Sequence, residues 1–307
     1  MRTQARSLTG QQGNETQWPA HPRSGRTTVP IRGRTPYAAH LSWIAFLSAL
    51  IVSLAIAIPM SSAAEELTED ELAKKTQNPI ADLISLPFQN NTSYKSGPRE
   101  RTQNTLNIQP VVPIGLGENF TLITRTIIPI VSQPSTARGE SRQDGIGDTS
   151  LSLFLSPKKP LFGALIFGAG PVFNIPTASD DALGADKWGM GLTAVGLTMQ
   201  GPVVAGLLIS NTWSLEGEDF SRFLLQPIFN YNLSGGWYLT SVPIMTADWE
   251  AEDNAWLVPV GGGFGKVHRI EGFPPMNIQV QAFYNAEKPK NGADWSTRFQ
   301  LQLLFPK

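Results

Sequence analysis

The sequence contains no cysteine and three histidines, and both shortages limit the chemistry that the protein can perform. Without cysteine there are no disulfides and no thiolate nucleophiles or ligands, which fits an exported protein that folds without covalent cross-links. Two of the histidines, His21 and His40, lie in the first 64 residues, which we expect to be removed as a signal peptide. His268 is then the one histidine of the mature chain. A histidine-based metal site is therefore excluded from the mature chain, and we expect no metal and no cofactor.

Charged residues are also scarce. They make up 16% of the chain, against about 25% in an average soluble domain. The formal net charge is -1, and this balance gives no electrostatic argument for a nucleic-acid partner. The 28 glycines and 24 prolines disfavour a helical protein, because both residue types destabilise helix interiors.

The first 64 residues have the organisation of a signal peptide. Residues 1–40 are polar and basic, residues 41–58 carry no charge, and small residues follow up to Ala64. This order predicts export, with cleavage after Ala64. An uncleaved membrane anchor is the alternative, because an apolar run of this length could just span a bilayer.

Residues 65–81 are expected to form a short periplasmic segment. Thr68 and Glu71 have the spacing of a capping box, so a helix is predicted from Thr68 to Lys75, and Asn78-Pro79 ends it. The segment either reaches the interior of the domain that follows or remains a frayed leader.

Residues 82–307 predict an all-β domain. The clearest strand runs from Ser296 to Phe305, where bulky apolar residues alternate with Arg298, Gln300 and Gln302, and this period of two indicates a half-buried strand. About ten alternating residues are typical of a strand that spans an outer membrane. Clusters of Gly, Pro, Asn and Asp separate the runs. The twelve predicted strands are residues 82–90, 104–114, 119–130, 148–156, 161–173, 188–200, 203–214, 221–232, 237–249, 256–266, 275–285 and 296–305.

The connections favour a single up-and-down transmembrane barrel of about twelve antiparallel strands. Short and long connections mostly alternate, as expected for periplasmic turns and outer loops, and an even strand count places both ends of the barrel on the periplasmic side. Tryptophan placement supports this reading, because amphipathic rings collect at the headgroup level in two girdles. Six tryptophans lie at or beside predicted strand ends, namely Trp188, Trp213, Trp237, Trp249, Trp256 and Trp295.

A soluble sandwich or lipocalin-like barrel is the main structural alternative, because periodicity does not distinguish the inside from the outside. Three features favour the membrane form. The polar faces are rich in amides and nearly uncharged, the charge is concentrated in the predicted loops, and the strands are longer than the usual length of about five or six residues.

Two arginines, Arg125 and Arg298, are predicted in the middle of strands. Facing lipid at mid-depth, an arginine would cost about 2–4 kcal/mol, so we expect both to face the lumen. There they either tune solute selectivity or form an internal salt bridge with Asp248. The predicted lumen-facing residues are Gln109, Arg125, Gln226, Asn230, Asp248, Gln279, Gln281, Arg298, Gln300 and Gln302.

Two acidic clusters are interpreted as loops rather than cation sites. Residues 144–148 lack the ligand pattern and closing glutamate of an EF-hand, and the aspartates at 180, 181 and 186 are expected in a solvated loop. Glycines within strands are expected at bends, bulges or places where an inward segment or a solute comes close.

The family resemblance is carried by the order of several stretches rather than by any one of them. They are Asn78-Pro79 followed by Leu86-Pro87-Phe88-Gln89-Asn90-Asn91, then Asn107-Ile108-Gln109-Pro110-Val111-Val112-Pro113, Arg125-Thr126-Ile127-Ile128-Pro129, Gly145-Ile146-Gly147-Asp148 and Gln226-Pro227-Ile228-Phe229-Asn230-Tyr231-Asn232. From about Asn78 to Phe305 the chain resembles the bacterial outer-membrane family named after the meta-pathway of phenol degradation, whose members are often labelled neuromedin U or transporter. The resemblance implies a β-barrel related to outer-membrane channels for fatty acids and aromatic hydrocarbons. It also implies that Phe305 is the terminal aromatic read by the barrel-assembly machinery, although Pro306 and Lys307 follow it here.

The sequence thus predicts an outer-membrane channel or transporter for small, hydrophobic or aromatic solutes, surrounded by outer-membrane lipid and lipopolysaccharide. A closed structural or adhesive barrel and a soluble periplasmic β-domain are the alternatives. An enzyme is not expected, because the mature chain has a single histidine and no G-x-S-x-G elbow from which a hydrolase could be built.

Overall fold

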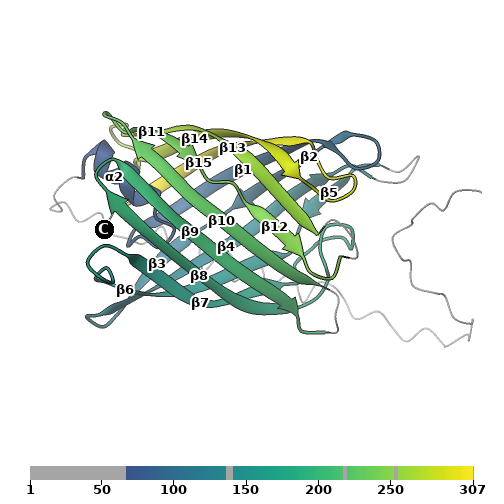
Figure 1. Cartoon of the computed structure of the whole chain (residues 1–307), viewed down its shortest axis with the longest axis horizontal. Coiled ribbons are helices and arrows are strands. Elements are labelled where there is room, and N and C mark those ends of the chain that lie inside the picture. The colour runs from purple at the N-terminus through teal and green to yellow at the C-terminus, as the bar shows by residue number, and fades with distance from the viewer. Residues whose placement is uncertain (1–66, 136–140, 217–219, 252–254, 307) are drawn as a thin grey trace, which may run out of the picture. The chain divides into compact units, whose positions relative to one another are not determined.

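The computed structural model describes residues 67–135, 141–216, 220–251 and 255–306 (Figure 1). The predicted signal peptide at residues 1–64 lies outside them. The described residues contain one helix, α2 (Glu69–Thr76), and are otherwise almost entirely β-structure. No helix in this part of the chain has the length and apolar character needed to cross a membrane.

Within the described ranges, fifteen β-segments form twelve barrel strands, because three of the strands are each split into two segments. The split strands are β2 with β3, β5 with β6, and β11 with β12. The bounds are β1 (Ile84–Ser96), β2 (Arg101–Ile108), β3 (Val111–Leu116), β4 (Phe120–Gln133), β5 (Gln143–Ile146), β6 (Thr149–Pro157), β7 (Ile166–Ile175), β8 (Gly189–Gln200), β9 (Val203–Ser214), β10 (Ser221–Asn232), β11 (Trp237–Ser241), β12 (Met245–Asp248), β13 (Trp256–His268), β14 (Met276–Glu287) and β15 (Trp295–Phe305).

Each strand pairs in antiparallel fashion with its neighbours in the sequence, and the last strand pairs with the first. The β1–β15 ladder runs from Ile84 opposite Phe305 to Tyr94 opposite Trp295. This ladder closes the sheet, so none of the described strands is left as an unpaired edge. The predicted fold class, an all-β up-and-down barrel of twelve strands, is confirmed.

The outer surface of the barrel is more apolar than its interior. Strand β14 shows this alternation clearly, because Gln279 and Gln281 are buried whereas Ile278, Val280 and Tyr284 are 40%, 40% and 65% exposed. A soluble barrel has the opposite arrangement, with its polar residues facing water. Exposed apolar side chains on the outer face are the arrangement expected of a barrel surrounded by lipid.

A proline or a glycine stands at each of the three splits. Pro110 separates β2 from β3, Gly147 separates β5 from β6, and Pro243 lies between β11 and β12. Proline has no backbone N–H to donate to a neighbouring strand. Pro227 and Pro259 lie in the strands on either side of Pro243, so three backbone donors are missing from neighbouring strands around residues 242–244.

Several predicted strand boundaries were wrong. The predicted strand at 161–173 begins only at Ile166, because Phe162 and Gly163 have positive φ angles of 49° and 79° and Leu161 pairs with Leu165 in a tight turn. The strands predicted at 82–90 and 104–114 are longer than expected and leave only residues 97–100 between them. Polar residues at the far end of β1 pair with β15 and continue the ladder, although their composition is typical of a loop.

Candidate functional site

A segment at the start of the described chain, residues 67–83, occupies one mouth of the barrel, which we call the α2 end (Figure 1). The predicted capping box is confirmed: the Glu71 backbone N–H donates to the Thr68 hydroxyl, and the Thr68 N–H donates to the Glu71 carboxylate. Hydrogen bonds from Thr68 hold the pKa of Glu71 below its usual range. These contacts fix the first turn of α2.

Apolar packing holds α2 against the inner wall. Leu72 is fully buried in a cluster that contains Tyr238 of β11, Val267 of β13 and Leu304 of β15. Gly265 makes this possible, because a side chain there would meet the Tyr238 ring at 2.3 Å. The helix therefore lies inside the barrel mouth rather than outside it.

Polar contacts attach the same segment to two turns at the α2 end. Asp70 accepts a hydrogen bond from the Gly236 N–H at 2.7 Å, and Glu69 accepts one from the Arg269 N–H at 3.0 Å. The side-chain amides of Gln77 and Asn232 donate to each other at 2.8 and 3.1 Å. The segment is thus held by both apolar and polar contacts.

Beyond α2 the segment extends into an apolar part of the interior. Ile80 packs in a buried cluster with inward-facing residues of five strands, namely Ile123, Phe154, Val195, Leu197, Val204, Leu208 and Ile228. A Cβ atom on Gly168 would lie 3.0 Å from the Ile80 side chain. This glycine leaves the space that the inward segment fills, which is one of the roles expected for glycines within strands.

A cavity of about 130 Å³, the α2-end cavity, lies between residues 75–83 and the barrel wall. Much of its wall consists of side-chain amides. Of the ten residues predicted to face the lumen, nine line this cavity: Gln109, Arg125, Gln226, Asn230, Gln279, Gln281, Arg298, Gln300 and Gln302. They come from separate parts of the chain, and barrel closure brings them together.

A second cavity, of about 420 Å³, lies toward the opposite mouth and is called the loop-end cavity. Its wall combines apolar side chains, including Phe154, Val172 and Leu208, with serine and threonine hydroxyls. Asp248, the tenth predicted lumen residue, lines this cavity. Arg125 lines both cavities and therefore stands at their junction.

The two arginines make different contacts. Arg298 is 7% exposed and donates through Nε to Asn91 at 3.0 Å and through Nη1 to the Val242 carbonyl at 2.8 Å. Arg125 donates through Nη2 to the Gln109 amide oxygen at 2.8 Å. Within the described residues, neither arginine forms an ion pair with Asp248, so the expected internal salt bridge is not present.

Arg298 has a structural task that the sequence did not reveal. The Val242 N–H donates to Gln281 at 3.1 Å, and the Val242 carbonyl accepts from Arg298. Both backbone groups of Val242 thus bond to lumenal side chains where the ladder is interrupted beside Pro243. In the sequence, only Pro243 could have indicated that the ladder is interrupted here. Nothing in the residue pattern identified Gln281 and Arg298 as the partners of Val242.

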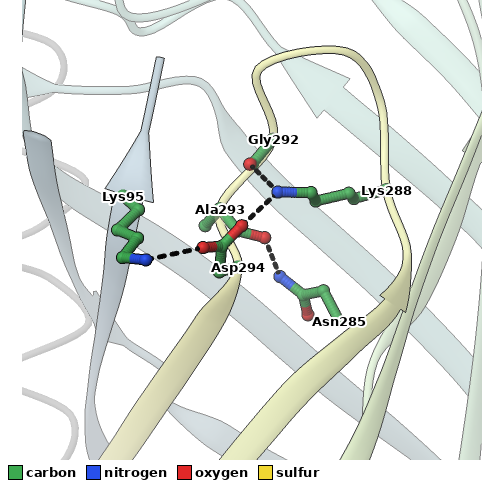
Figure 2. Close-up of polar contacts among 6 residues, drawn as sticks. All are labelled: Lys95, Asn285, Lys288, Gly292, Ala293 and Asp294. Carbon is green, nitrogen blue, oxygen red and sulfur yellow. Dashed lines mark hydrogen bonds and ion pairs between the residues drawn. The ribbon is translucent and has the colours of Figure 1, made fainter. Parts of the chain in front are cut away.

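The connection between β14 and β15 lies at the loop end and contributes Pro289 to the loop-end cavity. Figure 2 shows how Asp294 anchors it, through Lys288 of the same connection and through Lys95 of β1 at 3.2 Å. These two lysines hold the pKa of the Asp294 carboxyl below its usual range. Asn285 donates to the Ala293 carbonyl at 2.7 Å and fixes the base of the connection.

The six predicted girdle tryptophans lie at strand ends, but not evenly. Trp237 is at the α2 end and is 43% exposed. The other five are at the loop end, namely Trp188, Trp213, Trp249, Trp256 and Trp295. Trp295 stacks on Tyr94 with ring centroids 4.0 Å apart. Large exposed aromatic residues at the α2 end are mainly phenylalanines, including Phe120, Phe162 and Phe273.

The acidic stretch at residues 144–148 serves the local fold. Asp148 accepts hydrogen bonds from the backbone N–H groups of Ala178 and Ala185 and from the Asn174 amide. Its carboxylate thereby organises the connection between β7 and β8. The described residues contain no group of three or more side chains arranged to hold a metal ion.

Comparison with solved structures agrees with this architecture. No protein-family model matches the chain, and no curated protein matches it. Among solved structures, the COG4313 outer membrane channel from Pseudomonas putida F1 is similar, with 17% sequence identity, a TM-score of 0.55, and coverage of 73% of this chain and 94% of that chain. The chain has the fold of an outer-membrane barrel. At this identity the likeness concerns the fold alone.

Outer membrane phospholipase A from Escherichia coli also aligns, with 13% identity and a TM-score of 0.37, over 73% of this chain and 96% of that chain. At that score the alignment carries no argument about this protein. The exposed apolar exterior and the fold shared with the channel together support an outer-membrane location.

Proposed function

We propose that the protein is an outer-membrane channel for small solutes, with the α2 end facing the periplasm. One observation carries this proposal: an apolar exterior encloses two cavities whose walls bear amides, hydroxyls and arginines. A barrel that only anchored loops could fill its interior with packed side chains. Polar groups facing an internal space are those needed to pass a solute through a membrane.

The apolar side chains of the loop-end cavity favour solutes with a hydrophobic or aromatic part. The half-buried side chains of Ile127 and Leu224 line this space, and an apolar solute gains free energy by leaving water for such a wall. Phe305 ends β15 opposite Ile84, and we propose that it serves as the assembly signal.

Liposome swelling and single-channel conductance test the proposal with the full chain. Folded protein, identified by a band whose gel mobility changes on boiling, should permit uptake of small solutes and give discrete conductance steps. Boiled protein in the same vesicles is the control. Folded protein without conductance and without uptake would show that the barrel is closed.

The second candidate, a closed structural barrel, is favoured by the way the segment at residues 67–83 fills the α2 end. Because the chain has no cysteine, this can be tested by cross-linking. Cysteines at Gln77 and Asn232, joined by a short reducible cross-linker, would tether the segment to β10. If the segment gates the channel, the tether should lower conductance and reduction should restore it, whereas zero conductance in both states would support the closed barrel.

A further inference from the structure

The charged residues that line the two cavities, within the part of the chain that the structure describes, are unequal in sign. The cations are Lys75, Arg125, Arg222 and Arg298, and the one carboxylate is Asp248. The strand register places Arg222 opposite Asp248, so these two charges offset each other at the loop end. The remaining positive charges face the interior without a carboxylate partner on the described cavity walls. The lumen is therefore electrostatically suited to an anion.

The two deeply placed arginines differ in their availability to a ligand. Arg298 uses Nε and Nη1 on Asn91 and Val242, and its guanidinium lies 5.2 Å from the centroid of the Phe283 ring. Arg125 makes one side-chain hydrogen bond, through Nη2 to Gln109. A guanidinium has five N–H donors in a planar fork, so Arg125 retains donors that Arg298 has committed to the wall.

The position of Arg125 specifies what kind of anion would fit. On one side it faces the loop-end cavity, where the half-buried side chains of Ile127 and Leu224 provide apolar surface. On the other it faces the amide-lined α2-end cavity. A ligand held at this junction would place its charge on Arg125 and its apolar body on the loop-end side.

We propose that Arg125 binds the carboxylate of a small amphipathic acid whose compact apolar body occupies the loop-end cavity. The planar fork of arginine matches the two oxygens of a carboxylate. The apolar wall contributes through burial of the ligand body. This inference rests on the proposed channel function, because it names the solute class for the same lumen.

Equilibrium binding to the folded full-length protein in detergent tests the proposal without requiring transport. The probes at neutral pH are benzoate, benzyl alcohol, which has a similar ring and no charge, and acetate, which has the charge and no ring. Benzoate should bind at least about tenfold more tightly than either of the others, because it alone uses both the guanidinium and the apolar wall. Equal binding of benzoate and benzyl alcohol would overturn the proposal.

Variants of Arg125 and of an exposed arginine outside the cavities assign the site. Arg125→Gln should weaken benzoate binding by about tenfold or more and leave benzyl alcohol unchanged, as expected for loss of one charged hydrogen-bonding partner. Arg101→Gln is the matched control, because Arg101 is exposed and lines neither cavity, so this change should alter benzoate binding by less than about twofold. Equal losses in Arg125→Gln and Arg101→Gln would place the anion elsewhere and contradict the proposal.

Two further measurements cover the cases in which Arg125→Gln does not fold or in which binding and transport give different results. If Arg125→Gln does not give a heat-modifiable band, Arg125→Lys replaces it, and the comparison of the three probes on the unmodified protein still decides the proposal. Liposome swelling with the same probes separates this inference from the channel function. Uptake of neutral solutes without benzoate binding refutes the carboxylate site alone, whereas benzoate binding without any uptake refutes the channel alone.

Discussion

The two halves of the barrel interior are built on different principles. Strands β1, β14 and β15 present side-chain amides, including Gln279, Gln281 and Gln302, which we call the amide wall. Strands β4, β6, β8, β9 and β10 present apolar side chains, including Phe154 and Leu197, which we call the apolar wall. Both walls enclose the same lumen, and the segment at residues 67–83 touches both.

The difference lies in how each wall is stabilised. In the apolar wall, Ile80 and its neighbours exclude water by packing. Replacing one of these side chains with a smaller one leaves a cavity and lowers the free energy of unfolding. In the amide wall, the polar side chains form hydrogen bonds with one another. The Tyr238 hydroxyl donates to Asn277 at 2.7 Å, and the Gln279 amide donates to Thr240 at 3.1 Å. There the cost of a substitution depends on whether it leaves a buried partner without a hydrogen bond.

The largest effect is expected in the apolar wall. Phe154 is fully buried, so Phe154→Ala should lower the free energy of unfolding by about 3–5 kcal/mol. Urea unfolding in lipid vesicles measures this. Phe162→Ala is the control, because Phe162 is 98% exposed in a turn and should have no measurable effect. A loss below about 1 kcal/mol for Phe154→Ala would mean that the cluster is not tightly packed.

A smaller effect is expected where the inward segment meets the apolar wall. Ile80→Ala removes a side chain that is 4% exposed and should destabilise docking of residues 67–83 by about 2–4 kcal/mol. Protease cleavage within the segment should then become faster in the folded barrel. Ile146→Ala changes an exposed isoleucine and should leave the cleavage rate unchanged. Equal rates in both variants would show that Ile80 does not hold the segment.

In the amide wall the expected cost is lower still. Gln281→Leu deprives the Val242 N–H of its partner and should cost about 1–3 kcal/mol in urea unfolding. Gln300→Leu is the matched comparison, because the Gln300 side chain makes a long hydrogen bond of 3.4 Å to Gln302. It should cost less than Gln281→Leu. The opposite order would show that the break in the ladder at Val242 is stabilised by groups other than Gln281.

The smallest effect concerns the connection that Asp294 anchors. Lys288 and Lys95 lower the pKa of this carboxyl in the folded protein. The stabilisation is therefore fully present above the carboxyl's unfolded pKa and is lost as the pH falls through the lower folded value. Hydrogen exchange of the Gly97 amide, which donates to the Asn291 carbonyl at 2.8 Å, should show weaker protection at low pH. Asp294→Asn should remove this pH dependence, and an unchanged dependence would assign it to another group.

The sequence predicted the amide wall far better than the apolar wall. In β14 and β15, polar and apolar residues alternate, so the residue pattern by itself separates the inward face from the outward face. In β8, inward Val195 and Leu197 alternate with outward Leu192 and Ala194, and both faces are apolar. Because both faces of this strand are apolar, the residue pattern cannot show which face points inward. The arginines could be placed because of their cost in lipid.

Other features could not be predicted because they depend on contacts between distant residues. The capping box predicted α2, but its position inside the barrel mouth depends on Tyr238, Val267 and Leu304. The hydrogen bonds that join the Val242 backbone to Gln281 and Arg298 likewise cannot be predicted from the residues next to Val242 in the sequence. Short turns with positive φ, such as that at Phe162, also resist prediction because the residue type does not require them.

The pairing of β1 with β15 also has a kinetic consequence. Tyr94 and Thr297 are 203 positions apart and lie within 3.3 Å of each other through their hydroxyl groups, so the final ladder joins residues separated by most of the domain. Such nonlocal closure is slow to form. Until it forms, β1 and β15 each expose an unpaired edge that could pair with another chain. The period between insertion of β1 and arrival of β15 is thus the interval in which this barrel is most prone to aggregate and most dependent on assistance.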